Sequence, residues 1–221
     1  TALSVEAPAE AYTLWVEPNG ISITGGSDAG VFYAVQTLVQ LMEYYGKEIP
    51  VMKIEDAPRF GYRGLHLDIS RHFSDKKWVM KQLDMMARYK INTLHFHFTD
   101  NEGWRLEVPQ YPRLTEFGAW RETKNWFEWN KDGGPTSKGK FVEKGTPGAY
   151  GGYYTRKDME DVVAYAKKLH INVIPEIEMP GHSWEVVASY PELSCKGEPY
   201  SSRDVCIGNE DVFTFFENVL L

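Results

Sequence analysis

The sequence lacks the marks of a membrane protein or of a nucleic-acid binder. Its 221 residues contain no run of about 18 apolar residues, so we expect no membrane span. Acidic residues outnumber basic ones, 31 to 24, and the resulting net charge of -7 argues against a nucleic-acid partner, which a basic patch would bind. Residues 1–4 do not form a basic segment followed by an apolar run, so no signal peptide is expected within the chain.

Cysteine is also scarce, and its placement argues against a zinc site. Cys195 and Cys206 are the two cysteines of the chain, and neither belongs to a CxxC motif or to a cluster with histidines. We therefore expect neither a metal nor a cofactor. The polar loop between the cysteines leaves two interpretations open: a local disulfide that restricts the loop, or two reduced thiols in a cytosolic protein.

Residues 1–57 are predicted to form part of a small α+β domain. Alternating apolar and polar residues at 12–17 and 21–24 flank a turn sequence with Asn-Gly, which predicts a hairpin. A helix capped within residues 25–28 should follow and pack on the sheet. Its apolar stripe consists of Val31, Ala34, Val35, Leu38, Val39 and Met42. Residues 56–59 are interpreted as the linker to the next domain.

From residue 58 to residue 221 the pattern changes to three successive strand–helix units. Strands are expected at 64–69, 92–98 and 171–177. The helices that follow should begin at three capping residues or patterns, which are Ser74, the capping box at 155–158, and Asn209. Pro175 lacks a ladder donor and therefore suits a bulge or the end of the third strand.

Three such units with short links predict a parallel sheet, and the long loops after the second and third strands are typical of the catalytic face of a (β/α)8 TIM barrel. A flavodoxin-like sheet would begin in the same way. However, no glycine-rich phosphate loop follows any expected strand, which disfavours a nucleotide-binding sheet. We therefore predict an α/β fold in which 58–221 is the first part of a TIM barrel.

Polar residues stand at the carboxyl ends of the three expected strands. Arg71 follows the first strand, Asp100 ends the second, and Glu178 and His182 follow the third. These ends would meet on one rim of a barrel. The guanidinium fork of an Arg can grip vicinal sugar hydroxyls, and an Asp beside a His fixes the tautomer and charge of the imidazole.

Each of these residues also has a purely structural interpretation. Arg71 could form an ion pair with Asp68 or Asp75, Asp100 could be a loop or cap carboxylate, and His182 could be a hydrogen-bonded loop histidine.

Two further groups of side chains could be mistaken for reactive sites. His95 and His97 share a strand face, which parity places opposite Asp100, and together with His66 they could suggest a metal site. We expect hydrogen-bonded supporting roles instead. Glu176 and Glu178 also share a strand face, but they lie too close together to flank a glycosidic bond as a two-carboxylate pair.

Three long motifs resemble those of β-N-acetylhexosaminidases of glycoside hydrolase family 20, in the same order along the chain. They are RGLHLDISRHF at 63–73, HFHFTDNEGWR at 95–105 and PEIEMPGHS at 175–183. The segment 11–42 also resembles the end of the small α+β domain that precedes the barrel in this family. The resemblance therefore covers nearly the whole chain and implies a retaining exo-acting hydrolase of terminal GlcNAc or GalNAc.

Position by position, the resemblance implies a role for each strand-end residue. Arg71 matches the arginine that binds outer hydroxyls of the non-reducing sugar. Asp100 and His182 match an Asp–His pair that supports the general-acid glutamate. Glu178 stands where the family usually has Asp, and Trp104 belongs to the second motif without an assigned contact.

The family mechanism uses the 2-acetamido oxygen of the substrate as the nucleophile and forms an oxazolinium-like intermediate. An Asp–Glu pair after the fourth strand orients the acetamido group and protonates the leaving oxygen, but no Asp-Glu dipeptide occurs in this chain. We therefore expect a front portion of such an enzyme, inactive by itself. The alternatives are a non-catalytic sugar-binding remnant of the family, a different barrel hydrolase, and a structural interaction domain.

Three expectations concern partners and location. The partners should be glycans that end in N-acetylhexosamine. Open barrel edges should promote association with another copy of the chain or with the rest of a larger protein. The family and the cysteine loop suggest a periplasmic or secreted protein.

Overall fold

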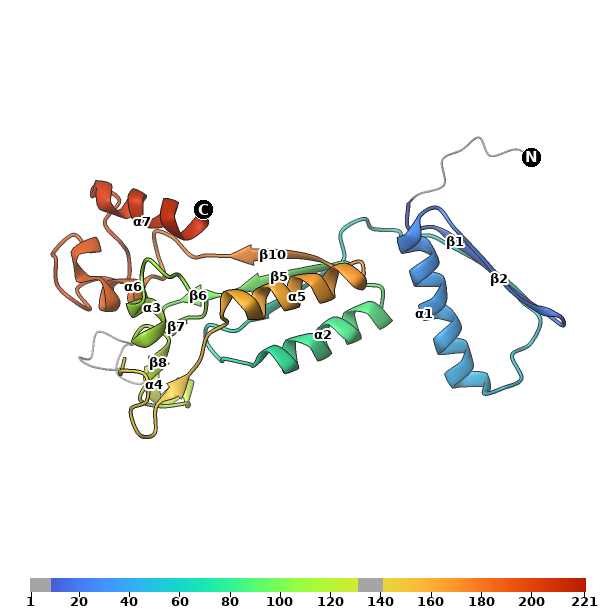
Figure 1. The fold of residues 1–221 in the computed structure, drawn as a ribbon, viewed down its shortest axis with the longest axis horizontal. Helices are drawn as coiled ribbons and strands as arrows, with labels where there is room; N and C mark the ends of the chain where they lie inside the picture. The colour runs from blue at the N-terminus through green and yellow to red at the C-terminus, as the bar shows by residue number, and fades with distance from the viewer. Residues whose placement is uncertain (1–8, 131–140) are drawn as a thin grey trace. The chain divides into compact units, whose positions relative to one another are not determined.

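The computed structural model describes residues 9–130 and 141–221 (Figure 1). Residues 1–4, where no signal peptide is expected, lie outside this described part. The chain divides into two compact units: unit 1 contains residues up to 65 with 80–94 and 164–172, and unit 2 contains 66–79, 95–163 and 173–221. Within the described ranges, no helix is both long and apolar enough to cross a membrane.

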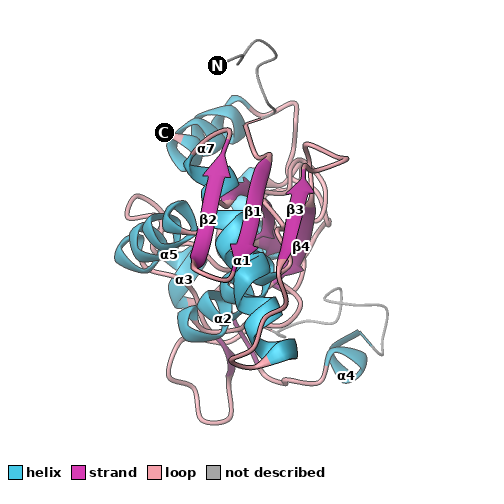
Figure 2. Cartoon of the chain, turned by 90° about the vertical axis from the view of Figure 1, so that its right-hand side faces the viewer, coloured by secondary structure: helices cyan, strands magenta, loops and turns pink. Residues whose placement is uncertain are grey.

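Unit 1 contains a three-stranded antiparallel sheet in the order β2-β1-β3 (Figure 2). The strands are β1 (Tyr12–Glu17), β2 (Gly20–Gly25) and β3 (Met52–Asp56). Leu14 of β1 is fully buried and lies opposite Ile23 and Ile54. The predicted hairpin is confirmed, whereas β3 was not predicted, because its alternation is short and runs into the interpreted linker.

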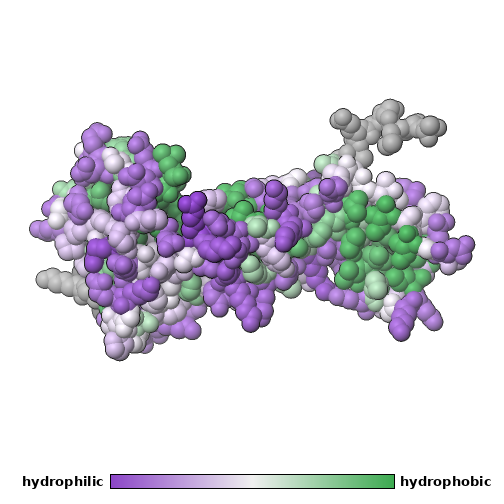
Figure 3. Space-filling view, in the orientation of Figure 1, coloured by the Kyte–Doolittle hydropathy of each residue, from purple (hydrophilic) through white to green (hydrophobic). Residues whose placement is uncertain are grey.

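Helix α1 (Asp28–Tyr45) packs on this sheet, and its N-cap Ser27 accepts a hydrogen bond from the Ala29 amide at 3.2 Å. The predicted stripe is partly wrong. Ala34 is buried and Leu38 packs against the same core, but four members of the stripe are 40–54% exposed: Val31, Val35, Val39 and Met42. They contribute to the apolar surface over α1 in Figure 3. Because α1 is apolar on two faces, its periodicity alone does not identify the face that meets the sheet.

The second sheet is parallel and has the strand order β10-β5-β4. Its strands are β4 (Gly64–Asp68), β5 (Thr93–His97) and β10 (Asn172–Glu176). Helix α2 (Lys76–Arg88) connects the first two strands, α5 (Arg156–Lys168) precedes β10, and α7 (Glu210–Leu220) follows it. Strand neighbours in space are therefore neighbours in sequence, as in the first three units of a barrel. Pro175 lies within β10, one residue before its end.

The starts of these helices test the predicted caps. The capping box before α5 is confirmed: the Thr155 amide donates to Asp158 Oδ2 and the Asp158 amide donates to Thr155 Oγ1, both at 3.1 Å. Asn209 caps α7 through the Asp211 amide at 3.0 Å. The cap predicted for α2 is one residue off, because Asp75 Oδ1 accepts from the Trp78 amide at 2.8 Å. Asp75 therefore occupies the capping position in place of Ser74, and Asp and Ser are about equally good N-cap residues.

The long segment between β5 and α5 and the segment after β10 form short elements. The first contains β6 (Thr99–Asp100), β7 (Gly103–Trp104), α3 (Arg113–Glu116), β8 (Trp120–Arg121), α4 (Trp126–Asn130) and β9 (Tyr150–Gly151). The second contains α6 (Trp184–Ser189) and the 3-10 helix η1 (Pro191–Leu193). A buried core that includes Trp104, Leu114, Val186 and Phe215 joins β7, α3, α6 and α7. This core supports the loops that carry the candidate site.

Candidate functional site

Asp100 lies at the centre of the candidate site, with its side chain only 1% exposed at the end of β6. Three side-chain nitrogens lie near its Oδ2 atom: Arg71 Nη2 at 2.5 Å, His182 Nδ1 at 2.9 Å and His97 Nε2 at 3.2 Å. The Asn101 amide donates to the other oxygen at 2.7 Å. Burial alone would raise the pKa of Asp100, but hydrogen bonds from the two histidines and the charge of Arg71 hold this pKa below its ordinary value.

Arg71 follows β4 and is held by three carboxylates. Its Nη1 lies 2.8 Å from Asp68 Oδ2, its Nη2 lies 2.5 Å from Asp100 Oδ2, and its Nε donates to Glu102 Oε2 at 3.0 Å. The ion pair with Asp68, which the sequence left as a structural alternative, is therefore present together with the contact to Asp100. The Arg71 side chain is still 33% exposed.

His182 lies in the turn after β10 and is the most open member of the group, with 56% of its side chain exposed. Its backbone is in the left-handed region, with φ of 53°, which is uncommon for a residue other than glycine. The hydrogen bond with Asp100 raises the pKa of His182. Glu178 is half-buried, its amide donates to Thr99 Oγ1 at 2.9 Å, and its carboxylate lies within 4.8 Å of ligand atoms of Asp100 and His182. The structure thus brings all four predicted strand-end residues together.

His97 contradicts the predicted separation of the histidine face from Asp100. Its Nε2 lies 3.2 Å from Asp100 Oδ2 and its Nδ1 lies 2.9 Å from Glu176 Oε2. The parity argument failed because β5 ends at His97 and a separate short strand begins at Thr99, so alternation is not continuous. Burial disfavours the imidazolium, yet hydrogen bonds to Asp100 and Glu176 raise the pKa of His97 to about 9.

Glu176 contacts all three histidines that could have suggested a metal site in the sequence. The ring nitrogens of His95, His97 and His66 lie 2.6, 2.9 and 3.4 Å from Glu176 Oε2. Two imidazoles and a carboxylate, here His66, His95 and Glu176, would also be a suitable donor set for Zn²⁺. The three rings thus surround one carboxylate oxygen, and His97 also hydrogen-bonds to Asp100 at 3.2 Å, which is the supporting role predicted for it.

Two buried arginines support the backbone that presents Arg71, and the sequence did not identify their role. Arg105 is fully buried and donates to the carbonyls of Ser70 at 2.7 Å and Ile69 at 3.2 Å. Arg121 is also fully buried and donates to the carbonyl of Arg71 at 2.8 Å. Burial lowers the pKa of Arg105 to about 10. Arg105 belongs to the second motif and could have been noticed there, whereas no local pattern marks Arg121.

A buried acid also escaped the sequence reasoning. Glu185 of α6 is 0% exposed, and burial raises its pKa well above the ordinary value. Its place in the otherwise apolar run of α6 was the available signal.

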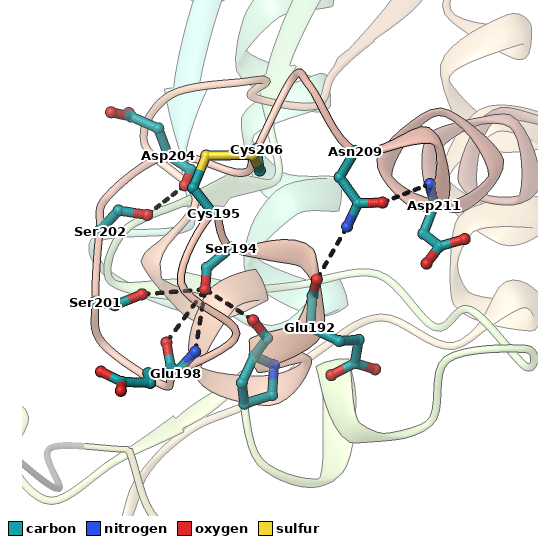
Figure 4. Close-up of a disulfide and its surroundings, with 11 residues drawn as sticks. Glu192, Ser194, Cys195, Glu198, Ser201, Ser202, Asp204, Cys206, Asn209 and Asp211 are labelled. Carbon is teal, nitrogen blue, oxygen red and sulfur yellow. Dashed lines mark hydrogen bonds between the residues drawn. A yellow bond between two sulfur atoms is a disulfide. The ribbon is translucent and has the colours of Figure 1, made fainter.

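The loop between the two cysteines supports the turn that carries His182. Cys195 and Cys206 form a disulfide (Figure 4), which confirms the first of the two interpretations of the pair. Backbone hydrogen bonds run from the Ser183 amide to the Arg203 carbonyl at 2.7 Å and from the Val205 amide to the Pro180 carbonyl at 2.9 Å. The end of the disulfide loop thus lies against the residues on both sides of His182.

Sequential parallel strands with polar residues at their carboxyl ends define a barrel-type protein with a candidate site on the rim. Comparison with known families identifies the barrel. The model described as "Glycosyl hydrolase family 20, catalytic domain" matches residues 60–220, and that of domain 2 of the same family matches residues 1–57. The chain belongs to glycosyl hydrolase family 20, as the three motifs predicted.

Individual relatives agree with this assignment. A β-hexosaminidase of Vibrio vulnificus is 46% identical over 178 residues, which cover 80% of this chain and 20% of that protein. One from Porphyromonas gingivalis is 36% identical over 228 residues, covering 96% of this chain and 27% of that protein. The crystal structure of the Vibrio harveyi exo-β-N-acetylglucosaminidase with N-acetylglucosamine matches with a TM-score of 0.77 and 32% identity, covering 96% of this chain and 34% of that one. The chain thus spans about a fifth to a third of the relatives it matches.

Proposed function

We propose that this chain supplies the part of a retaining exo-β-N-acetylhexosaminidase that holds the non-reducing sugar. The observation that carries the proposal is the meeting of Arg71 and His182 at one buried carboxylate, Asp100, at the ends of three successive strands. The family membership and the N-acetylglucosamine complex of the Vibrio harveyi relative support an N-acetylhexosamine as the ligand.

Each side chain has a distinct part in this proposal. Arg71 is already paired with carboxylates, and a guanidinium has five N–H donors, so donors that these contacts do not use can bind sugar hydroxyls without bringing an unpaired charge to the ligand. The Asp100–His182 pair presents an imidazole that is oriented by Asp100 and has a raised pKa towards a neighbouring general acid. Glu178 is close enough to this pair to accept a hydrogen bond from a further sugar hydroxyl.

The chain by itself should bind but not hydrolyse, because it contains no Asp-Glu pair to orient the acetamido group and protonate the leaving oxygen. Loss of general-acid catalysis alone lowers a rate by about 10²–10⁴. The competing candidate, a sugar-binding remnant of the family, predicts the same behaviour for this chain. The two are separated by whether the gene of origin continues into an Asp-Glu segment.

The test is a binding measurement followed by an activity measurement on the 221-residue chain. We expect N-acetylglucosamine to bind with a dissociation constant on the order of 1 mM by calorimetry or NMR titration. Binding should be this weak because the chain supplies only part of the sugar site. Arg71→Gln should weaken binding roughly tenfold through the lost charged hydrogen bonds. Arg113→Gln is the matched control, because Arg113 is an exposed arginine paired with Glu143 away from the site.

Two results would oppose the proposal. Equal affinity of wild type and Arg71→Gln would remove Arg71 from the sugar site. Hydrolysis of 4-nitrophenyl N-acetyl-β-D-glucosaminide by the chain would show that the acid resides within it.

We also propose that the isolated chain self-associates and that it functions in the periplasm or outside the cell. In the described sheet, β4 and β10 each pair with β5 alone, which leaves an open edge on either side. The Cys195–Cys206 disulfide suits an oxidising compartment. A monodisperse monomer in sedimentation velocity would oppose the first statement, and recovery of the protein from a cytosolic fraction would oppose the second.

A further inference from the structure

The carboxylate that joins Arg71 to His182 has a third partner, His97, which does not face the sugar side of the group. We propose that His97 is a positioning residue: held between Glu176 and Asp100, it fixes the Asp100 carboxylate so that one oxygen serves both Arg71 and His182. This inference rests on the proposed function in naming Arg71 and His182 as the sugar-facing side chains.

The ring of His97 lies between two carboxylates. Its side chain is 4% exposed, with Glu176 Oε2 2.9 Å from Nδ1 and Asp100 Oδ2 3.2 Å from Nε2. Ionised carboxylates only accept hydrogen bonds, so an imidazole between two of them donates from both nitrogens and carries a positive charge. The pKa of His97 is raised to about 9 by these hydrogen bonds in spite of burial, in agreement with that charge.

The other charged groups around His97 come from each neighbouring strand. From β4 and the residues after it come Asp68, which favours the imidazolium, and Arg71, whose Nη1 lies 3.3 Å from His97 Nε2. Since both of these nitrogens carry hydrogens, we interpret this approach as a contact of two cations around the shared Asp100 oxygen, not as a hydrogen bond. From β10 comes Glu176, which also contacts His66 and His95.

This arrangement explains why Asp100 needs a third partner. Arg71 approaches Asp100 Oδ2 most closely, at 2.5 Å, while His182 is an exposed residue on a turn. The Asn101 amide holds Asp100 Oδ1, but without a fixed donor to Oδ2 from the buried side, that second oxygen can follow the guanidinium and leave His182. His97, on a central strand and itself anchored by Glu176, supplies that fixed donor from a rigid element.

Two substitutions separate the two contacts of His97. In His97→Gln the terminal amide reaches the position of Nε2 and can still donate to Asp100. In His97→Asn the shorter amide reaches the position of Nδ1, so it keeps the Glu176 contact and loses Asp100. A role limited to filling space would make the larger Gln and the smaller Asn differ in stability alone.

The first measurement is the pKa of the His182 imidazole, followed by NMR titration in the full chain. We expect it to remain raised in wild type and His97→Gln, and to fall towards the ordinary value in His97→Asn. The affinity for N-acetylglucosamine should fall in parallel, roughly tenfold in the Asn variant, the effect of one charged hydrogen bond. An unchanged His182 pKa in a folded His97→Asn protein would overturn the inference.

The two proposals fail in different ways. If the sugar does not bind wild type but the His182 pKa responds as described, the proposed function fails and the positioning role of His97 stands. If either variant does not fold, the test is an NMR count of the ring N–H protons of His97 in the wild-type protein at about pH 7. Two protected N–H protons support the inference, and a single one contradicts it.

Discussion

His182 Nδ1 lies 2.9 Å from Asp100 Oδ2, although 82 positions separate the two residues in the sequence. One of the pair is on an exposed turn and the other is almost fully buried. The exposed imidazole is therefore oriented by a carboxylate that solvent does not reach, and ionisation of the two residues is coupled.

Replacement of Asp100 by Asn should destabilise the protein strongly. The amide would leave Arg71, His97 and His182 around a neutral group, and loss of one partner from a buried charge cluster typically costs about 3–5 kcal/mol. Urea unfolding measures the change. Asp211→Asn, an exposed carboxylate at the start of α7, is the control and should change the free energy of unfolding by less than about 1 kcal/mol. Equal effects of the two substitutions would contradict the central place of Asp100.

His182 combines a site role with an unfavourable backbone conformation, and the two can be separated. At φ of 53°, Asn is tolerated well and a β-branched residue is not. Both variants lose the hydrogen bond to Asp100, so the difference between them reports the backbone: we expect His182→Val to be less stable than His182→Asn by about 1–2 kcal/mol. Both should lose the proton that titrates with a raised pKa. Equal stability of the two variants, measured by thermal unfolding, would argue against the left-handed turn.

Stability should fall at alkaline pH because of His97. Its pKa is raised from 6.5 to about 9 on folding, so the folded protein holds a proton that the unfolded chain releases. The resulting stabilisation is fully present below pH 6.5, decreases above it and is lost as pH rises through about 9. It amounts to about 3 kcal/mol. Urea midpoints between about pH 6 and 10 measure this loss, and His97→Gln should flatten the dependence; an equally steep fall in that variant would point to other groups.

The fully buried Arg105 should be more important for folding than an exposed arginine. Its guanidinium donates to five backbone carbonyls: Ile69, Ser70, Glu102, Ala119 and Gly152. Arg105→Met leaves these acceptors unsatisfied, at a cost of about 3 kcal/mol or more. Arg156→Met, at a side chain that is 87% exposed, is the matched control and should have little effect on the urea midpoint. Sugar affinity should also fall in Arg105→Met, because the backbone before Arg71 loses its support.

Replacement of both Cys195 and Cys206 by Ser should lower stability by about 3 kcal/mol, as expected for a loop of this length. The loop end at 203–205 is hydrogen-bonded to the turn around His182, so its resonances should also shift and broaden. Thermal unfolding and NMR of the Ser variant test the two effects. Ser201→Ala, which removes a contact to Ser194 inside the same loop but leaves the disulfide intact, is the control (Figure 4).

The sequence predicted the features that depend on local patterns. The three parallel strands, the capping box before α5, the Asn209 cap and the family followed from periodicity and from contiguous motifs. It also placed Arg71, Asp100, Glu178 and His182 at strand ends, where the structure brings them together.

The missed features depend on contacts between distant residues or on interruptions of a pattern. The break between β5 and β6 turned His97 towards Asp100, which strand parity could not reveal. The burial of Arg105 and Arg121 depends on carbonyls contributed by several loops. Similarly, the outer face of α1 is as apolar as the face on the sheet, so composition could not orient the helix.

The disulfide of Figure 4 links the oxidation state of two cysteines to the turn that carries His182. The residues on both sides of His182 are hydrogen-bonded to a loop that an oxidised cysteine pair closes. A change in the oxidation state of the pair would thus reach the turn with His182 through the hydrogen bonds at Arg203 and Val205. Oxidation of the cysteine pair and the orientation of the His182 turn are therefore linked through the backbone of one short loop.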